Sequence, residues 1–298
     1  MTERTHGGAG GAVPALGRER RGLVLMVASA ASFALMAAIA KRWLADTPTQ
    51  AVVLSRGLVM SLVFITLARR AGVDLLGRHR RLLLTRGLLG YVSLSCYFWS
   101  VQHLPLGDAV LLQYTHPIFV GALAPFVLGE ATARRHWWIV SVAFVGVALV
   151  VGPSGALRGV MGIALTGALC SGLAYITIRR LAACEHPLTI MVWFPLATLP
   201  GATVGVALAG RAALPRDSGE VLAHLAVAAA GLAGQVTLTR GLAQIDAARG
   251  TAATMTGPAF GALFGLVLFG TVPGPWTLLG MLIVGACAVA LAYERRRT

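Results

Sequence analysis

Gln113 and His116 are polar residues inside a long apolar segment, so they are the first candidates for chemistry. Gln113, His116 and Val120 recur at i, i+3 and i+7, which places them on one face of a continuous helix. Tyr114 is adjacent, and Pro117 leaves one backbone carbonyl without its helical partner. A histidine here can carry a coupling proton or hydrogen-bond a polar solute. The structural alternative is a neutral His116 that donates to a neighbouring carbonyl, such as the one freed by Pro117.

A second polar face precedes this segment. Ser93, Cys96, Tyr97 and Ser100 recur at helical spacing, with Trp99 beside them. Such a face could stack on and hydrogen-bond a ring-bearing or amphipathic solute. Equally, the Ser and Cys side chains could let two helices approach closely, with Tyr97 and Trp99 at a membrane interface.

Arg56 and Arg86 also interrupt apolar segments, and each needs a partner there. Their depths suggest one ion pair between Arg56 and Asp108 and another between Arg86 and Glu130. These pairs would be structural, or would act as gates that break alternately.

The elements that hold these residues must lie in a membrane. Of the 298 residues, 57% are hydrophobic and only 12% are charged, whereas a soluble domain has about 25% charged residues. The mean hydropathy is +0.77. Although the net charge of +14 would suit a nucleic-acid partner, the cations cluster between apolar runs. We therefore expect an all-α membrane protein with no nucleic-acid partner.

About 20 apolar residues are needed for a helix to span the bilayer, and the chain offers ten such segments. They are residues 22–40, 51–68, 82–102, 107–128, 136–152, 159–178, 188–209, 221–239, 247–269 and 275–293. We expect ten transmembrane helices.

The distribution of Lys and Arg predicts the orientation. With the N-terminus inside, 18 cations fall on the cytoplasmic side and five fall outside. Both termini are therefore expected in the cytoplasm, and the protein in the cell (inner) membrane. Residues 1–21 are predicted to be a disordered tail and residues 294–298 a basic tail.

An internal repeat relates the two halves. Pro117 and Pro258 are separated by 141 residues, and Gly129 and Gly270 by the same number. Each copy holds five spans, an odd number, so the second copy is inverted relative to the first. Residues 22–156 and 157–293 are thus predicted to be two inverted five-helix repeats, an arrangement typical of secondary transporters.

The repeat extends the candidate site into the second half. Thr254 and Met255 align with Gln113 and Tyr114, and Gln235 and Thr239 lie on the preceding span. We expect them across a cavity from the first set, although a Thr hydroxyl can also bond within its own helix. Ser32, Phe33, Met36, Tyr175 and Trp193 are weaker candidates.

The segment SVQHLPLGDAVLLQYTHPIFVGALAPFVLGE, residues 100–130, resembles the signature of EamA-type members of the drug/metabolite transporter superfamily. The resemblance covers about residues 21–293 and implies ten spans and the transport of metabolites, with a tendency toward export. Gly270 and Thr271 replace the Gly-Glu that closes this segment in the first copy, so a role for that carboxylate belongs to one half.

The sequence predicts a secondary transporter, an exporter or exchanger, of small polar or amphipathic metabolites. Binding is assigned to Tyr97, Trp99, Ser100, Gln113, Tyr114, His116, Gln235, Thr239, Thr254 and Met255, with His116 as the proton-coupling candidate. There is no Walker A motif, H-E-x-x-H or G-x-S-x-G, and we expect no enzyme activity, cofactor or metal. The alternatives are an integral membrane enzyme acting on a lipid head group, and an uncoupled channel. A functional monomer is the simplest expectation, with a dimer as the alternative.

Overall fold

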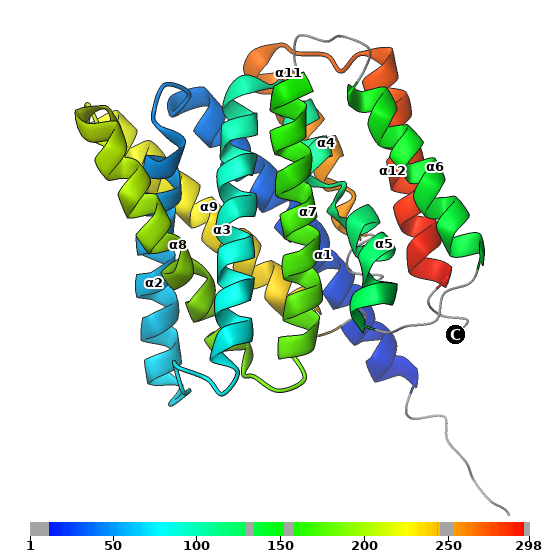
Figure 1. Cartoon of the computed structure of the whole chain (residues 1–298), viewed down its shortest axis with the longest axis horizontal. Coiled ribbons are helices and arrows are strands. Elements are labelled where there is room, and N and C mark those ends of the chain that lie inside the picture. Colours follow the sequence, from blue (N-terminus) through cyan, green and yellow to red (C-terminus); the bar gives the residue numbers. More distant parts are fainter. Residues whose placement is uncertain (1–11, 129–133, 152–157, 243, 245–252, 295–298) are drawn as a thin grey trace, which may run out of the picture.

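The computed structural model of the protein describes residues 12–128, 134–151, 158–242, 244 and 253–294. These residues form a bundle of helices joined by turns, with no strand among them (Figure 1). The α-helices are α1 (Ala12–Trp43), α2 (Thr49–Arg70), α3 (Arg80–His103), α4 (Leu106–Gln113), α5 (His116–Leu128), α6 (Arg134–Val151), α7 (Arg158–Leu181), α8 (Pro187–Ala209), α9 (Ser218–Leu242), α11 (Gly257–Phe269) and α12 (Pro275–Glu294), and η2 (Gly210–Ala213) is a short 3-10 helix.

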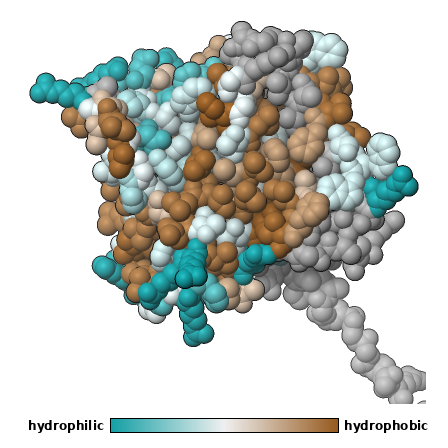
Figure 2. All heavy atoms as spheres, viewed as in Figure 1, coloured by the Kyte–Doolittle hydropathy of each residue, from teal (hydrophilic) through white to brown (hydrophobic). Residues whose placement is uncertain are grey.

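Among the described residues, five helical segments are long and apolar enough to cross a membrane. They are Arg20–Trp43, Thr49–Arg70, Gly159–Leu181, Pro187–Ala209 and Ser218–Gly241. Shorter apolar helices cover Trp137–Gly146, Gly257–Phe269 and Pro275–Cys287. Apolar side chains cover the middle of the face shown in Figure 2, and hydrophilic ones gather toward its edges. The chain is therefore a multi-pass membrane protein.

The first helix is longer than the sequence predicted. It begins at Ala12, so residues 12–21, expected to be disordered, continue the helix. Residues 1–11 and 295–298 of the predicted tails lie outside the described residues.

The segment expected as one span over residues 107–128 is two helices. It breaks at Tyr114 and Thr115, between α4 and α5. Pro117 has no N–H to offer a carbonyl one turn earlier, and the Thr115 hydroxyl donates to the Leu112 carbonyl at 2.7 Å. Gln113 and His116 therefore do not share the face of one continuous helix.

A matching break occurs in the second half of the chain. The turn at Met255 and Thr256 precedes α11, whose second residue is Pro258. The two turns are separated by the same 141 residues as the two prolines. In each half, the turn lies directly before a helix whose second residue is a proline.

The helices pack in a reciprocal pattern. Helix α1 packs on α9 and α3 packs on α7, α3 also contacts α8 as α2 contacts α9, and α1 lies on α11 as α5 lies on α7. Two further pairs are α2 with α8 and α6 with α12. Close approach of α3 and α8 depends on Gly87, where an added Cβ would overlap the Cβ of Ala197.

One end of the bundle carries the start of α1, the end of α12, and the loops joining α2 to α3 and α7 to α8 (Figure 1). Glu185 joins these two loops: one carboxylate oxygen accepts the backbone N–H groups of Arg78 at 2.7 Å and His79 at 2.6 Å. The Thr189 hydroxyl also donates to the Asp74 carbonyl at 2.7 Å. The exposed arginines at this end are Arg69, Arg70, Arg78, Arg80, Arg81, Arg179 and Arg180.

Candidate functional site

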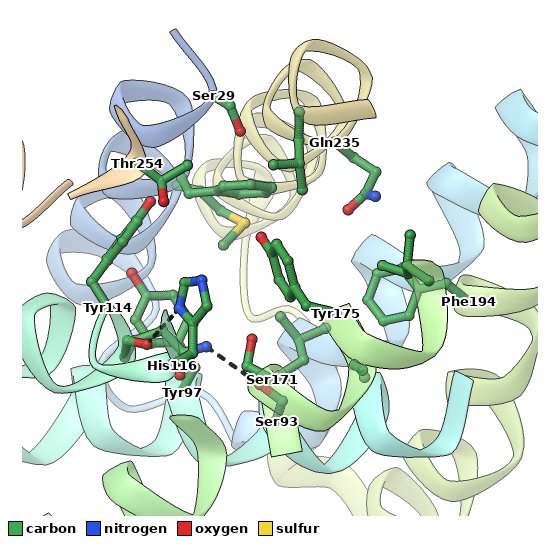
Figure 3. Close-up of a pocket in the computed structure, with 18 of the residues that line it drawn as sticks. Ser29, Ser93, Tyr97, Tyr114, His116, Ser171, Tyr175, Phe194, Gln235 and Thr254 are labelled. Carbon is green, nitrogen blue, oxygen red and sulfur yellow. Dashed lines mark hydrogen bonds between the residues drawn. The ribbon is translucent and has the colours of Figure 1, made fainter. Parts of the chain in front are cut away.

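A cavity of about 120 Å³ lies among helices from both halves of the chain. Each water molecule needs roughly 10–15 Å³ on this measure, so the cavity has room for several waters or a small solute. Six of the ten binding residues predicted from the sequence line it: Tyr97, Gln113, Tyr114, His116, Gln235 and Thr254. Figure 3 labels all of these except Gln113.

The break between α4 and α5 orients His116. Its Nδ1 atom lies 3.0 Å from the Gln113 carbonyl oxygen, which is the group one turn before Pro117. Because a carbonyl oxygen only accepts, Nδ1 carries a hydrogen and Nε2 of the neutral ring is an acceptor. Nε2 is buried and has no hydrogen-bond partner. Thus the structural role expected for His116 is present, and its second nitrogen remains available to a ligand.

Aromatic rings surround this histidine. The His116 ring centroid lies 4.8 Å from that of Tyr175 and 5.8 Å from that of Tyr114. Tyr114 fits tightly because it faces Gly257, where an added Cβ would overlap the tyrosine ring. These rings give the cavity flat apolar walls with polar edges.

Arg56 and Arg86 both reach this cavity, from α2 and α3. They are only 3% and 6% exposed, and their guanidinium carbons lie 5.5 and 4.5 Å from the centre of the Phe194 ring. These carbons are therefore within about 10 Å of each other, where two positive charges repel by at least about 1.7 kcal/mol at an effective dielectric constant of about 20. The ring offsets part of that repulsion through cation–π contacts.

The predicted ion pair between Arg56 and Asp108 is not formed. Asp108 instead hydrogen-bonds the side chain of Thr277. Ion pairs within the described ranges join His79 to Glu185 and Arg216 to Glu220, and neither involves a cavity arginine. Similar backbone depth does not bring the two groups together, because a long Arg side chain reaches several ångströms from the level of its own backbone. Glu130, the partner expected for Arg86, lies outside the described residues.

Unsatisfied polar atoms concentrate in the cavity. In the part of the chain that the structure describes, seven buried side-chain nitrogen or oxygen atoms have no hydrogen-bond partner, and five of them belong to cavity residues. Those five are Arg56 Nε, Arg86 Nε, Tyr97 Oη, Gln113 Oε1 and His116 Nε2. Because such atoms are normally satisfied, their clustering indicates a site for a polar ligand or water.

Four predicted binding residues do not line the cavity. Trp99 stacks on His103, with ring centroids 4.0 Å apart, and Met255 packs against the main hydrophobic core. The Ser100 hydroxyl donates to the Cys96 carbonyl at 2.7 Å, and that of Thr239 to the Gln235 carbonyl at 2.9 Å. Both hydroxyls are therefore satisfied within their own helices.

Sequence reasoning missed several cavity residues. Ser29, Ser171 and Phe194 were not selected, and Tyr175 was only a weak candidate, yet all four line the cavity. Ser32 was chosen on the first span instead, and its hydroxyl bonds the Ala28 carbonyl of the same helix at 2.8 Å. Ser29 lies three residues before Ser32 on the first span, so helical spacing from Ser32 is the signal that could have identified it. No signal distinguished Phe194 from other aromatic residues in the spans.

A second cavity, of about 130 Å³, adjoins the first toward the loop between α7 and α8. The two share Arg86, Ile178, Gln235 and Leu238, and the second extends to Ala182 and Pro187 at the ends of α7 and α8. Thr239 lines this second cavity. The shared residues place the second cavity between the central one and the end of the bundle that carries the α7–α8 loop.

Comparisons with known proteins agree with this picture. The model of the EamA-like transporter family matches residues 20–152 and again residues 158–293. The pseudopaline exporter of Pseudomonas aeruginosa is 30% identical over 283 residues, covering 93% of this chain and 98% of the exporter. The riboflavin transporter of Rhizobium johnstonii is 28% identical over 216 residues, covering 72% and 71% of the two chains.

A solved crystal structure shares the fold. It superimposes with a TM-score of 0.62 at 22% identity, covering 95% of this chain and 98% of the other. Human solute carrier family 35 member G1 is 24% identical over 233 residues, which is 73% of this chain and 63% of the human protein.

Proposed function

Because the chain belongs to the EamA-like transporter family, we propose that it is a secondary transporter that carries a small polar or amphipathic metabolite across the cell membrane. The family and the named relatives are transporters, so the protein is a membrane transporter and not an enzyme. The observation that carries the proposal is the central cavity with its cluster of unsatisfied polar atoms.

The transport cycle would use two inverted repeats of five spans each. Three observations support this arrangement: the family model matches twice, the helix breaks repeat at one offset, and the helices of the two halves exchange packing partners. An interrupted helix in each half, with a site between the halves, is typical of transporters built in this way. In this count of ten spans, α4 and α5 together form the fourth span, and α11 is part of the ninth.

Alternating access would open the cavity to each side in turn. The second cavity, which runs to Ala182 and Pro187, is the candidate path on one side. Toward the other end, Leu104 and Leu106 are fully buried and would form the closed layer, and the Lys41 ammonium donates to the Leu104 carbonyl at 2.7 Å. Rocking of the two halves would separate that layer and close the path near α7 and α8.

The basic residues support an orientation for this cycle. The end that carries the exposed arginines of the α2–α3 and α7–α8 loops would face the cytoplasm, under the rule that positive charge stays inside. Both termini would then be cytoplasmic, in the inner membrane, and the cavity path described here would open inward. Likeness to the pseudopaline exporter favours export or exchange.

Counterflow in proteoliposomes tests the proposal. Vesicles are loaded with a mixed pool of amino acids, vitamins, nucleosides and organic acids and cations, and each is then added outside as a labelled tracer. A carrier would show saturable, transient accumulation of one class above protein-free vesicles. Fluxes that are linear in concentration, with no accumulation against a gradient, would favour the uncoupled channel and contradict a carrier.

A further inference from the structure

We infer that the transported solute is an organic anion whose carboxylate or phosphate group binds between Arg56 and Arg86, on the inward face of the central cavity. This inference rests on the proposed transport function and specifies its substrate class. Two guanidinium groups from different helices meet on one aromatic ring, and both line the same cavity.

The charge of the cavity is unbalanced. No described Asp or Glu lines it, whereas both arginines do. Each arginine is more than nine-tenths buried, and each Nε has no hydrogen-bond partner. A buried charge with no counter-charge is strongly unfavourable. We therefore expect the negative partner of these arginines to be a group of the solute itself.

The geometry of the arginines suits an oxyanion. A guanidinium presents its N–H groups in a planar fork that matches the oxygens of carboxylate and phosphate groups. Gly231 and Gly90 leave the space that these side chains occupy: an added Cβ would lie 2.5 Å from Arg56 Nε at the first and 2.6 Å from an Arg86 terminal nitrogen at the second. The Phe194 ring contacts both guanidinium groups.

The remaining cavity atoms describe the other end of the solute. Gln113 Oε1 and His116 Nε2 are unsatisfied acceptors, and Tyr97 offers a hydroxyl. Acceptors require a donor, so the solute should also carry a hydroxyl, amine or N–H group. The rings of Tyr114 and Tyr175 leave flat apolar walls between the two ends.

The test is ligand-induced stabilisation of the purified full-length protein in detergent. The probes are acids that also carry a hydroxyl or amine (malate, citrate, glutamate, aspartate), phosphate monoesters (glycerol 3-phosphate, glucose 6-phosphate), and matched neutral amides, sugars and cationic amines. At least one anion should raise Tm in a saturable manner, and neutral and cationic counterparts should not. Stabilisation by a carboxylate or by a phosphate ester identifies the source of the oxyanion.

Variants then locate the site. Arg86→Gln and Arg56→Gln should each weaken anion binding at least 10-fold, because charge-assisted hydrogen bonds are lost. Arg86→Lys, which keeps the charge but loses the fork, should fall between wild type and Arg86→Gln. Arg211→Gln, at an exposed position in η2, should leave binding unchanged.

Stability separates a binding role from a structural one. If the arginines await an anion, removing one unpaired buried charge should leave the ligand-free Tm of Arg86→Gln equal to or above that of wild type. A structural arginine would instead lower Tm when replaced.

Three results would overturn the inference: stabilisation by neutral or cationic solutes only, anion binding as tight as wild type in both Arg→Gln variants, or no stabilisation by any anion in folded protein. Saturable counterflow of a neutral or cationic solute would keep the transport function while removing the anion. A linear, non-saturable flux would remove the transport proposal itself.

Discussion

The Nδ1 atom of His116 lies 3.0 Å from the carbonyl oxygen of Gln113, across the break between α4 and α5. In a continuous helix that carbonyl would bond the residue four positions later, which is Pro117 and has no N–H. His116 therefore satisfies the backbone group that the proline leaves free. The same bond fixes the tautomer and leaves Nε2 as an unsatisfied acceptor in the cavity.

His116→Gln should lower transport about 10-fold, because the cavity loses the Nε2 acceptor and the imidazole ring between Tyr114 and Tyr175. If His116 also carries a coupling proton, the wild-type rate should depend on pH and the variant's should not. The measurement is initial counterflow rate against pH for both proteins.

The proton would add a third positive charge to a cavity that holds Arg56 and Arg86, so its uptake would accompany an incoming anion. The other titratable groups facing His116 are the hydroxyls of Tyr97, Tyr114 and Tyr175. Unchanged rate and unchanged pH profile in the variant would remove the coupling role.

The carboxylate that joins the two loops should make stability depend on pH. Partial burial by itself raises the pKa of Glu185. Hydrogen bonds from the backbone of His79 and Arg78 and from the His79 side chain outweigh this effect and hold the pKa below its usual value of about 4.5. The folded state thus binds fewer protons than the unfolded state, and this stabilisation is present above pH 4.5 and lost as the pH falls through the lowered value.

Glu185→Gln should consequently lower Tm at pH 7, and its difference from wild type should shrink as the pH is taken below about 4.5. The measurement is thermal unfolding in detergent over this range. A difference that stays constant down to pH 3 would show that the charge of Glu185 has no part in holding the loops.

Gly87→Ala should destabilise the bundle by about 1–3 kcal/mol, because the new methyl group would overlap Ala197 where α3 and α8 meet. The matched control is Gly162→Ala in α7, where an added Cβ meets nothing within 4 Å. That change should stabilise the helix by about 0.5–1 kcal/mol. Equal Tm values for the two variants would contradict the close packing of α3 on α8.

Two serines on one helix test which face of α3 binds solute. Ser93 lines the cavity and its hydroxyl accepts from Gln113 Nε2 at 3.3 Å, whereas Ser100 bonds within its own helix. Ser93→Ala should raise the KM for counterflow several-fold, by loss of about one hydrogen bond. Ser100→Ala should leave it unchanged, and the reverse order would mean that the cavity is not the binding site.

The membrane class and the central polar residues were predictable from the sequence. Gln113, His116, Gln235 and Thr254 stand out because polar groups are costly in apolar segments, and each lines the cavity. The prolines located both helix breaks approximately, although the sequence was read as continuous spans. Of the polar face predicted on the third span, Ser93 and Tyr97 line the cavity and Ser100 does not. Helical spacing groups residues on one face but does not show which other helix or cavity that face contacts.

The contacts of individual side chains could not be predicted from the sequence. Arg56 was paired with Asp108 from backbone depth, but its flexible chain turns toward Phe194. Phe194 itself carries no sequence signal, because aromatic residues in spans usually serve packing. The hydroxyls of Ser100 and Thr239 looked like site groups, yet a carbonyl one turn earlier satisfies each of them.

The most direct test of the account is whether the central cavity is reached from both sides of the membrane. Ser171, in the cavity wall, is replaced by Cys after Cys96, Cys170, Cys184 and Cys287 are changed to Ala or Ser, and an impermeant thiol reagent is applied to either side of oriented vesicles. The account predicts labelling from both sides, slowed by the solute that accumulates in counterflow. Labelling from one side only, at a rate that the solute does not change, would contradict it.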